Sequence, residues 1–565
     1  MNLNCVPHEN EDDLNRIIIV VYFKLNNDYV TVSGDCPNAA MSIITDQCSY
    51  TVPSAEWSLK YQTGGWDGKI SLFNKRLMTF PAGLLPIVVD KLKASNIQYT
   101  VENARFKPTV EKKAIVDLGP HSFRDYQEEA IKKIKEKTRG ILAMCTGAGK
   151  TKTSCGIISE LSVYPVIFVV PSVSLLKQTV REFGESLKPL TDDFFIGEIG
   201  GGKCDIATGG VNVATYQTLL TAFDRKYSES KKKVVDIEND KTSMDSLLGQ
   251  MKILSIDLLN SPQSKHKSIE KKIKDLKKKI ESKQKMRQSK ADLRDLVSKC
   301  QLLIIDETHI AAEIIEEISL KAKSAYYKCG LSGTPQRMDN QDIRMFGATG
   351  PVIHKVTSSD LIKRGFLVRP SIYCIDIEFI DKTSGAYQET YKNAIVQSQQ
   401  RNELIRDLAE DMHSQGRPTL IMVERIEHGK ILEEMIENCL FVPGGDGSDD
   451  KPIPDEELDY RKYQLDRLEK NEIIMCATSW CFTGIDAPKI SCIILACSLG
   501  SPNTITQQLG RGLRKAEGKS DCVVFDFKHK EKSLKSQFYS RNKVYKSEDE
   551  FYVKSFKHKD GYSNN

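Results

Sequence analysis

Two adjacent carboxylates and a histidine follow a short apolar run in the middle of the chain. Asp306, Glu307 and His309 come directly after residues 302–305, which read Leu-Leu-Ile-Ile. Such a run is typical of a buried strand, so the acids are expected at the exit of that strand. One carboxylate there could hold Mg²⁺ while the other activates water, which is the chemistry of nucleotide hydrolysis.

A turn with two glycines lies upstream, after another apolar run at 141–144. It consists of Thr146, Gly147, Ala148, Gly149, Lys150 and Thr151. Glycines let successive backbone N–H groups face an anion at the start of a helix, whose dipole also favours negative charge. Lys150 would then reach the β and γ phosphates of ATP, and the Thr151 hydroxyl would join Asp306 in holding Mg²⁺. The general pattern has glycine where this chain has Met144, so the match is to a variant loop.

Two arginines and a glutamine in segment 507–514 could complete the same site. Arg511 and Arg514 are three residues apart, which predicts one helical face, and Gln507 lies one turn earlier. An arginine reaching across a cleft would stabilise the charge that develops on the γ-phosphate as two lobes close. A surface salt-bridge cluster is the alternative role for these arginines.

The elements that must position these residues follow an alternating rhythm. Between residues 122 and 365, apolar runs alternate with helical patterns, which predicts a parallel sheet with crossover helices. The runs are 141–144, 166–170, 211–214, 302–305 and 327–331. A second set follows between 368 and 527, with runs at 419–423, 473–477, 492–496 and 522–525. The predicted fold class is therefore α/β, with two tandem lobes.

The ends of the chain differ from these lobes. Residues 1–115 mix short β-rich segments with one helix-like stretch, which predicts a small α+β accessory domain that binds substrate. The first, ATP-binding lobe is expected at 116–365 and the second at 366–530. Residues 531–565 read as a basic, partly disordered tail.

A helical segment at 224–299 interrupts the first lobe. Ile269, Ile273, Leu276 and Ile280 are spaced four, three and four residues apart, and an apolar stripe upstream could face them in an antiparallel hairpin. Its second arm, 264–290, carries twelve Lys and Arg against three acids. A solvated surface, an arm on the DNA backbone and a protein-docking arm all remain open.

Composition describes an ordinary globular chain. The net charge is only +5, with 81 Lys and Arg against 76 Asp and Glu, so affinity for nucleic acid must come from local patches. The fifteen cysteines form no C-x-x-C pair, which favours buried thiols in a reducing compartment over zinc sites or disulfides. No apolar run approaches the roughly 20 residues of a membrane span. We therefore expect no membrane association and a place in the cytoplasm, the host cytoplasm if a phage encodes the chain.

From about residue 123 to residue 525, the order of short motifs resembles that of superfamily 2 helicases. The resemblance implies two RecA-like lobes and an ATPase that works on nucleic acid, and the variant phosphate loop suits this family. Asp306-Glu307-Thr308-His309 together with Ser332-Gly333-Thr334-Pro335 departs from the DEAD-box RNA helicases and resembles DNA-acting branches. DNA, branched or single-stranded and without sequence preference, is thus the implied partner.

The family motifs assign further residues to the nucleotide. Arg124, Tyr126 and Gln127 resemble the adenine-reading motif, with Gln127 expected on the base edge. Gly484 and Asp486 belong to a segment that resembles motif V and are expected to bind the nucleotide from the second lobe.

Other motifs imply contact with nucleic acid and its coupling to hydrolysis. Residues that resemble backbone-contacting positions are Pro171, Ser172, Thr215, Gln217 and Thr478. Residues expected to relay the ATP state to the nucleic-acid groove are His309, Ser332, Gly333 and Thr334.

The N-terminal stretch refines the implied function. Residues 61–84, with Gly65-Trp66-Asp67-Gly68-Lys69-Ile70, resemble the small accessory domain of a phage recombination helicase. This resemblance implies unwinding or branch migration of forks and recombination intermediates, with the 3′ to 5′ polarity typical of the family. For residues 64–69, a glycine-bounded hairpin with Trp66 in a core is an equal alternative to DNA contact. An RNA or RNA–DNA hybrid helicase, or a duplex translocase that does not separate strands, is the competing function.

Overall fold

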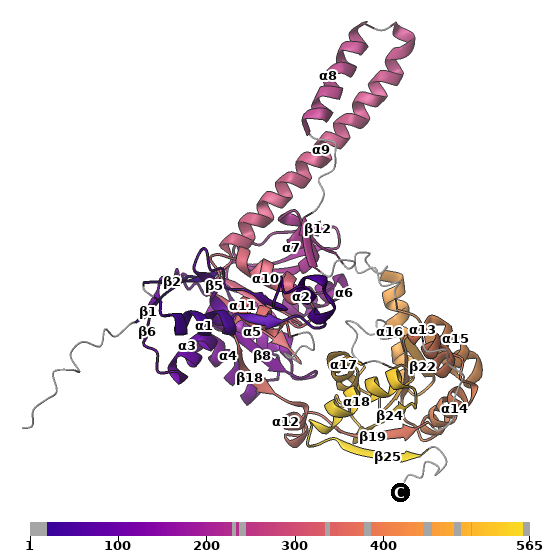
Figure 1. Ribbon diagram of the computed structural model, residues 1–565. Coiled ribbons are helices and arrows are strands. Elements are labelled where there is room, and N and C mark those ends of the chain that lie inside the picture. The colour runs from indigo at the N-terminus through magenta and orange to yellow at the C-terminus, as the bar shows by residue number, and fades with distance from the viewer. Residues whose placement is uncertain are drawn as a thin grey trace, which may run out of the picture.

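The computed structural model shows a small N-terminal domain, two α/β lobes and a long helical hairpin (Figure 1). The structure describes residues 20–34, 36–228, 233–236, 244–260, 262–333, 340–377, 386–444, 455–478, 487–498 and 500–557. Within these residues no helix is long and apolar enough to span a bilayer. Most of the described cysteines are buried, as predicted.

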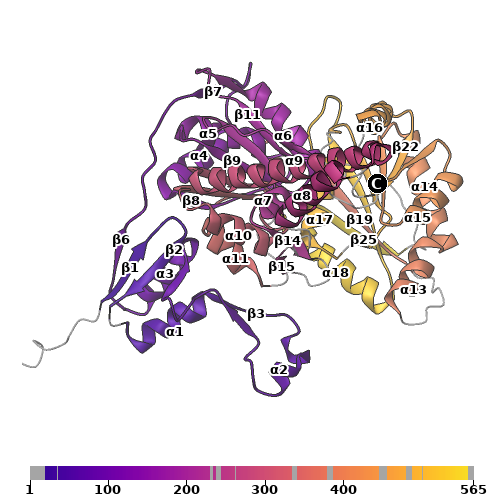
Figure 2. The same ribbon diagram turned by 90° about the horizontal axis from the view of Figure 1, so that it is seen from above.

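The N-terminal domain is an α+β unit docked on the first lobe. Its four-stranded sheet has the order β5-β2-β1-β6. The strands are β1 (Val21–Leu25), β2 (Tyr29–Ser33), β5 (Thr79–Pro81) and β6 (Tyr99–Asn103). Two helices, α1 (Asn38–Gln47) and α3 (Leu85–Ala94), complete its core. A ribbon of β3 (Ser49–Thr51) and β4 (Lys69–Ser71), with α2 (Leu59–Gln62) near its tip, extends from the sheet (Figure 2).

Close backbone approach fixes this domain against lobe 1. A side chain at Gly83 would place its Cβ 2.0 Å from the carbonyl oxygen of Phe346, so only glycine allows this packing. The buried Arg139 guanidinium also donates to the carbonyl of Asn27 at 3.1 Å. These contacts place the domain beside helix α11 (Asp342–Thr349) of lobe 1, which packs on helix α10 (Ala312–Lys321).

Lobe 1 is built on an eight-stranded sheet of order β12-β11-β13-β9-β16-β17-β8-β18, parallel except for β12. Its strands are β8 (Arg139–Met144), β9 (Val166–Val170), β11 (Ile196–Gly200), β12 (Lys203–Cys204), β13 (Val211–Thr215), β16 (Leu302–Ile305), β17 (Tyr327–Ser332) and β18 (Val352–Val356). The other helices are α4 (Asp125–Lys137), α5 (Lys150–Leu161), α6 (Val173–Ser186), α7 (Tyr216–Ala222) and α12 (Ser358–Lys363). A separate strand pair joins β7 (Ala114–Val116) to β10 (Leu187–Pro189).

Lobe 2 has a seven-stranded parallel sheet of order β21-β22-β20-β23-β24-β19-β25. Its strands are β19 (Arg369–Asp376), β20 (Thr419–Val423), β21 (Cys439–Val442), β22 (Ile474–Thr478), β23 (Cys492–Leu495), β24 (Asp521–Lys528) and β25 (Tyr552–Lys557). Its helices are α13 (Tyr387–Tyr391), α14 (Gln399–Ser414), α15 (Ile426–Met435), α16 (Asp455–Glu469), α17 (Pro502–Gly512) and α18 (Lys532–Lys546), with a π-helical turn at Lys392–Val396. The prediction of two parallel-sheet α/β lobes is confirmed.

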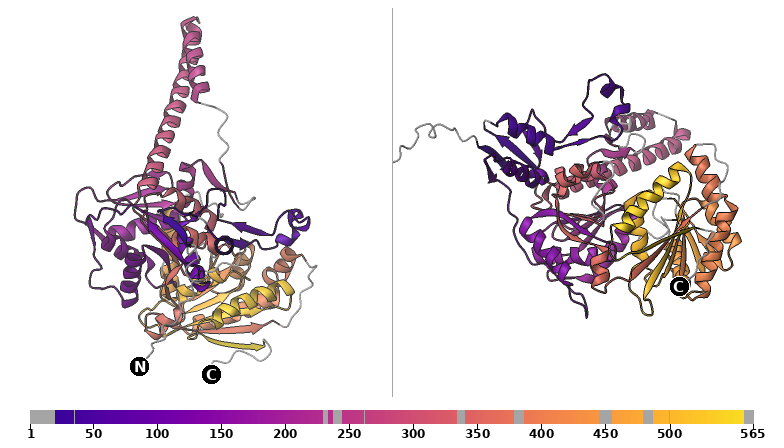
Figure 3. Two further views of the ribbon diagram at one scale, coloured as in Figure 1. Left: turned by 60° about the vertical axis from the view of Figure 1, so that its left-hand side comes forward. Right: turned by 60° about the horizontal axis from the view of Figure 1, so that its bottom comes forward.

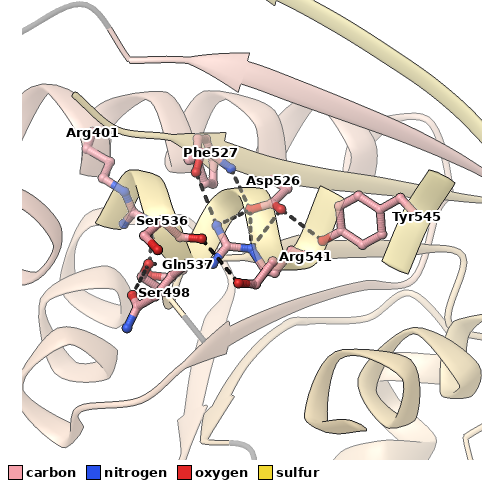
Figure 4. A network of polar contacts seen from close by, with 10 residues as sticks. Arg401, Ser498, Asp526, Phe527, Ser536, Gln537, Arg541 and Tyr545 are labelled. Carbon is pink, nitrogen blue, oxygen red and sulfur yellow. Dashed lines mark hydrogen bonds and ion pairs between the residues drawn. The ribbon is translucent and has the colours of Figure 1, made fainter. Parts of the chain in front are cut away.

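The prediction of a basic, partly disordered tail from residue 531 is wrong as far as residue 557. Helix α18 packs on lobe 2, and β25 extends its sheet by pairing with β19. A buried polar network fixes α18: Arg541 donates to both oxygens of Asp526, and the Tyr545 hydroxyl donates to the same carboxylate at 2.8 Å (Figure 4). The expected disorder at 561–565 lies outside the described residues.

The hairpin consists of α8 (Met244–Asn260) and α9 (Gln263–Lys299) and projects away from both lobes (Figures 1 and 3). Leu247 of α8 packs against Leu276 and Ile280 of α9. A short two-stranded ribbon, β14 (Arg225–Ser228) and β15 (Lys233–Asp236), precedes α8. Helix α9 ends at Lys299, and Leu293 and Val297 on its last turns belong to the core of lobe 1.

Candidate nucleotide-hydrolysing site

The glycine-containing turn connects β8 to α5 in lobe 1. Gly147 has φ 84° and Gly149 has φ 79°, a left-handed backbone that favours glycine. A Cβ at Gly149 would also lie 2.5 Å from Nε2 of Gln127. Helix α5 begins at Lys150, so the turn presents the N-terminus of a twelve-residue helix, a position that suits an anion.

The two carboxylates stand at the exit of β16, facing this turn. The Lys150 ammonium lies 2.5 Å from Oε1 of Glu307, and both side chains are largely buried. Glu307 has φ 49°, a conformation that a non-glycine residue adopts at a cost of about 1–3 kcal/mol. The surrounding bonds hold this strain, since Thr308 N–H donates to the carbonyl of Leu331 at 3.0 Å.

Burial and charge separate the two acids. Burial raises the pKa of Asp306 to about 6, although the charge of Lys150 partly opposes this. Burial also acts to raise the pKa of Glu307, but Lys150, His309 and a hydrogen bond from Gln507 outweigh it, so the pKa is lowered. The pKa of Lys150 is raised, because Glu307 and Asp306 outweigh the effect of burial. Of the two acids, Asp306 thus has the raised pKa and Glu307 the lowered one.

His309 connects the acids to the next strand. Its Nδ1 lies 2.9 Å from the Ser332 hydroxyl at the end of β17 and 3.3 Å from Oε2 of Glu307. The structure therefore brings together His309 and Ser332, two of the predicted coupling residues. Gly333 follows next to the turn, and Thr334 lies outside the described residues.

Helix α17 brings lobe 2 against the turn. A Cβ at Gly510 would lie 2.4 Å from Cβ of Thr146, so this glycine permits direct contact between the lobes. Gln507, one turn earlier, reaches Glu307. The expectation that Arg511 and Arg514 share one helical face is wrong, because α17 ends at Gly512.

Beyond this helix end, Arg514 forms an antiparallel bridge with Leu367, in the segment that joins the lobes. Its side chain lies beside the turn, since a Cβ at Gly147 would be 3.9 Å from Cγ of Arg514. Burial lowers the pKa of Arg514, partly offset by Glu182 of α6.

The predicted adenine-reading residues are hydrogen-bonded to the turn and to one another. Arg124 donates to the Tyr126 hydroxyl at 2.8 Å, and that hydroxyl donates to the carbonyl of Ala148 at 3.1 Å. The Gln127 amide donates to the same carbonyl at 3.0 Å. Tyr126 is 2% exposed, so it holds the loop in place from beneath.

Sequence reasoning missed two residues beside this group. The Arg124 guanidinium lies 4.0 Å from the centre of the Phe366 ring, and Arg364 forms an ion pair with Asp125. Phe366 and Arg364, the two missed residues, belong to the connection between the lobes. Their neighbours in sequence form no recognisable motif, so only the fold reveals them.

The predicted nucleic-acid residues lie at the ends of strands. Ser172 caps α6 after β9, and Thr215 caps α7 after the adjacent β13. The Gln217 amide donates to the carbonyl of Pro171 at 3.3 Å, which joins these two segments. In lobe 2, Thr478 is the last residue of β22, and its hydroxyl accepts a hydrogen bond from the N–H of Gly444 at 2.6 Å. The segment with Gly484 and Asp486 is outside the described residues.

Known proteins resemble part or most of this chain. A family model described as "Type III restriction enzyme, res subunit" matches residues 120–337. The ATP-dependent DNA helicase UvsW of Enterobacteria phage T4 is 22% identical over 532 residues, which cover 88% of this chain and 89% of UvsW. The DNA 3′-5′ translocase XPB2 of Sulfurisphaera tokodaii is 39% identical over 99 residues, or 18% of this chain and only 21% of that protein. A solved structure of T4 UvsW matches with a TM-score of 0.41 at 18% identity, covering 95% of this chain and 99% of that one.

The two relatives named above are a DNA helicase and a DNA translocase, and the matched family model spans the turn and both acids. Together with the order of the motifs, these findings support an ATP-hydrolysing superfamily 2 helicase that resembles UvsW.

Proposed function

We propose that this protein is an ATP-driven helicase that moves 3′ to 5′ on DNA and remodels forks and recombination intermediates. The observation that carries the proposal is the contact between Gly510 of lobe 2 and Thr146 of the phosphate-binding turn. Because the two lobes meet at this turn, a bound nucleotide would touch both of them. Hydrolysis and release would then change how the lobes sit on a DNA strand.

Lys150 and Glu307 would exchange partners when nucleotide binds. The two side chains form an ion pair of 2.5 Å beside the turn. Phosphate oxygens would replace Glu307 as the partner of the Lys150 ammonium, which would free the carboxylate. Glu307 would then orient a water for attack on the γ-phosphate.

Asp306 and Thr151 offer oxygen atoms, the ligands that Mg²⁺ prefers. Mg²⁺ when bound neutralises charge on the phosphates. ATP and Mg²⁺ are thus the proposed substrate and cofactor.

Residues of lobe 2 would complete the site. Arg511 would stabilise charge on the γ-phosphate, Arg514 would hold the joining segment against the turn, and Gln507 would position Glu307. The hydrogen bond between His309 and Ser332 would pass the state of the nucleotide to β17.

The DNA strand would lie across the ends of β9, β13 and β22. Ser172, Thr215 and Gln217 from lobe 1 and Thr478 from lobe 2 would contact its backbone, together with main-chain N–H groups. Such contacts carry no sequence information, so binding should be independent of sequence and weakened by salt.

Substitution of Lys150 tests the site. Lys150→Ala should lower DNA-stimulated ATP hydrolysis by about a hundred-fold or more while DNA binding changes little. Lys152→Ala is the matched control, because Lys152 lies on the same helix and is exposed. Unchanged turnover in Lys150→Ala would refute the assignment.

A panel of substrates tests the track. Unwinding and ATPase stimulation should be strongest with forked or branched DNA that has a 3′ single strand. Stronger stimulation by RNA or an RNA–DNA hybrid would replace the proposal with an RNA-acting helicase. Stimulation by duplex DNA without strand separation would indicate a translocase.

A further inference from the structure

Helix α9 carries a row of lysines on the face turned away from α8. Leu276 and Ile280 pack against α8, which fixes the inward side of the helix. At about 100° per residue, five exposed lysines fall within roughly 50° of the opposite side. They are Lys267, Lys271, Lys274, Lys278 and Lys285. Among the described residues, none of the five forms an ion pair with a carboxylate.

This arm concentrates the positive charge of the whole protein. Residues 264–290 carry twelve Lys and Arg against three acids, a net charge of +9. The whole chain carries +5, so all other residues together carry −4. The hairpin is therefore the basic part of an otherwise slightly acidic molecule, and it projects away from the lobes (Figure 1).

The base of the arm is fixed to the helix that follows the predicted track. Lys290 forms an ion pair with Asp224 at 2.6 Å, and Arg294 donates to the carbonyl of Ala222 at 2.5 Å. Ala222 is the last residue of α7, whose N-terminal cap is Thr215. Helix α9 is continuous from this anchor to its tip. The position of the lysine row relative to the predicted path of the DNA strand is therefore fixed.

The row suits phosphates better than a protein surface. Lysine is depleted in the centres of protein interfaces, and the row contains no apolar side chain, with Ser282 in its single gap. From Lys267 to Lys285 it extends about 27 Å at about 1.5 Å per residue. The same length of duplex carries about sixteen phosphate charges.

We infer that the lysine row on α9 binds the phosphate backbone of a duplex arm of the DNA, outside the two lobes. The inference rests on the proposed function, because it takes the lobes to hold the single strand of the same substrate. The arm would then favour DNA that presents a duplex next to a single strand, and it would do so without reading sequence.

Neutralising the row tests the inference. The variant K267Q/K271Q/K274Q/K278Q/K285Q should bind a forked DNA with long duplex arms at least tenfold more weakly at about 150 mM salt. The slope of log K against log salt concentration should become less steep by about 0.9 for each phosphate that the row no longer neutralises, hence by about 2–4. In the wild type, bound fork should protect these lysines from chemical acetylation, as read by mass spectrometry.

Four exposed lysines on α18 of lobe 2 provide the matched control, namely Lys532, Lys535, Lys543 and Lys546. Their combined change to glutamine should alter neither the affinity nor the salt slope. An unchanged slope in the row variant, or protection of the row by an acidic polypeptide but not by the fork, would overturn the inference. Stimulation of the wild-type ATPase by a short single strand tests the proposed function separately, because such a strand has no duplex to offer the arm.

Discussion

Glu307 shows how single residues of this site depend on their surroundings. Its left-handed backbone and its ion pair with Lys150 lie at the junction of β16 with the loop that follows. Two adjacent acids after an apolar run were enough to predict the strand exit. The difference between their pKa values could not be predicted, because it depends on burial and on Lys150 and Gln507, which are far from Glu307 in sequence.

A buried lysine away from this site gives a prediction about pH. Lys328 in β17 is 1% exposed and donates to the carbonyl of Ser319 at 2.7 Å. Burial, and next the charge of Arg139, lower the pKa of Lys328 to about 7 from 10.5. Between these values the unfolded chain holds the proton that the folded chain has released, so this group makes stability rise with pH.

Lys328→Met should remove that rise. Between pH 7.5 and 9.5, wild-type lobe 1 should gain up to about 2 kcal/mol of unfolding free energy relative to the variant. Urea denaturation of both proteins at the two pH values measures the difference. Equal pH dependence in the two proteins would show that Lys328 keeps an ordinary pKa in the folded chain.

At the scale of elements, we expect the contact between α17 and the turn at residues 146–151 to decide whether the lobes can close. Gly510→Ala should lower DNA-stimulated kcat by about tenfold or more, because its methyl group would lie where Thr146 now packs. Gly184→Ala on α6 is the control, since a Cβ there meets nothing within 4 Å. Steady-state ATPase assays compare the two, and equal rates would mean that the lobes do not need this contact.

The C-terminal elements give a second prediction at this scale. Asp526 is 0% exposed, so loss of its partner in Arg541→Met would leave a buried charge and should destabilise lobe 2 by about 3–5 kcal/mol. Lys543→Met on the same helix should have little effect, because Lys543 is exposed. Chemical denaturation followed in lobe 2 reports both values, and similar stabilities would exclude α18 as a structural part of that lobe.

The elements also show where sequence reasoning succeeds and where it stops. Continuous apolar runs predicted β9 and β16 with the bounds they have. Strand β25, with the sequence Tyr-Val-Lys-Ser-Phe-Lys, read as part of a basic tail, and only its pairing with β19 makes it a strand. Arg514 was wrongly predicted to lie on a helix, because helical spacing alone does not reveal the bridge to Leu367 that follows the helix end.

At the scale of the whole molecule, three parts of the protein contact lobe 1. The N-terminal domain packs on α11 through Gly83, and the base of the basic hairpin is hydrogen-bonded to α7. Lobe 2 contacts lobe 1 at the turn. Because each attachment joins an element next to a predicted functional motif, motion of the lobes would carry the attached parts with it. We therefore expect a motor whose site exists only when both lobes contribute.

ATP hydrolysis by Arg511→Ala tests this central claim most directly. With DNA present, kcat should fall by about a thousand-fold, because the arginine from lobe 2 would no longer stabilise the γ-phosphate, while ATP binding to lobe 1 persists. Arg406→Ala, at a surface ion pair with Asp407 in the same lobe, should keep the wild-type rate. Hydrolysis by Arg511→Ala at the wild-type rate would contradict a site completed by both lobes.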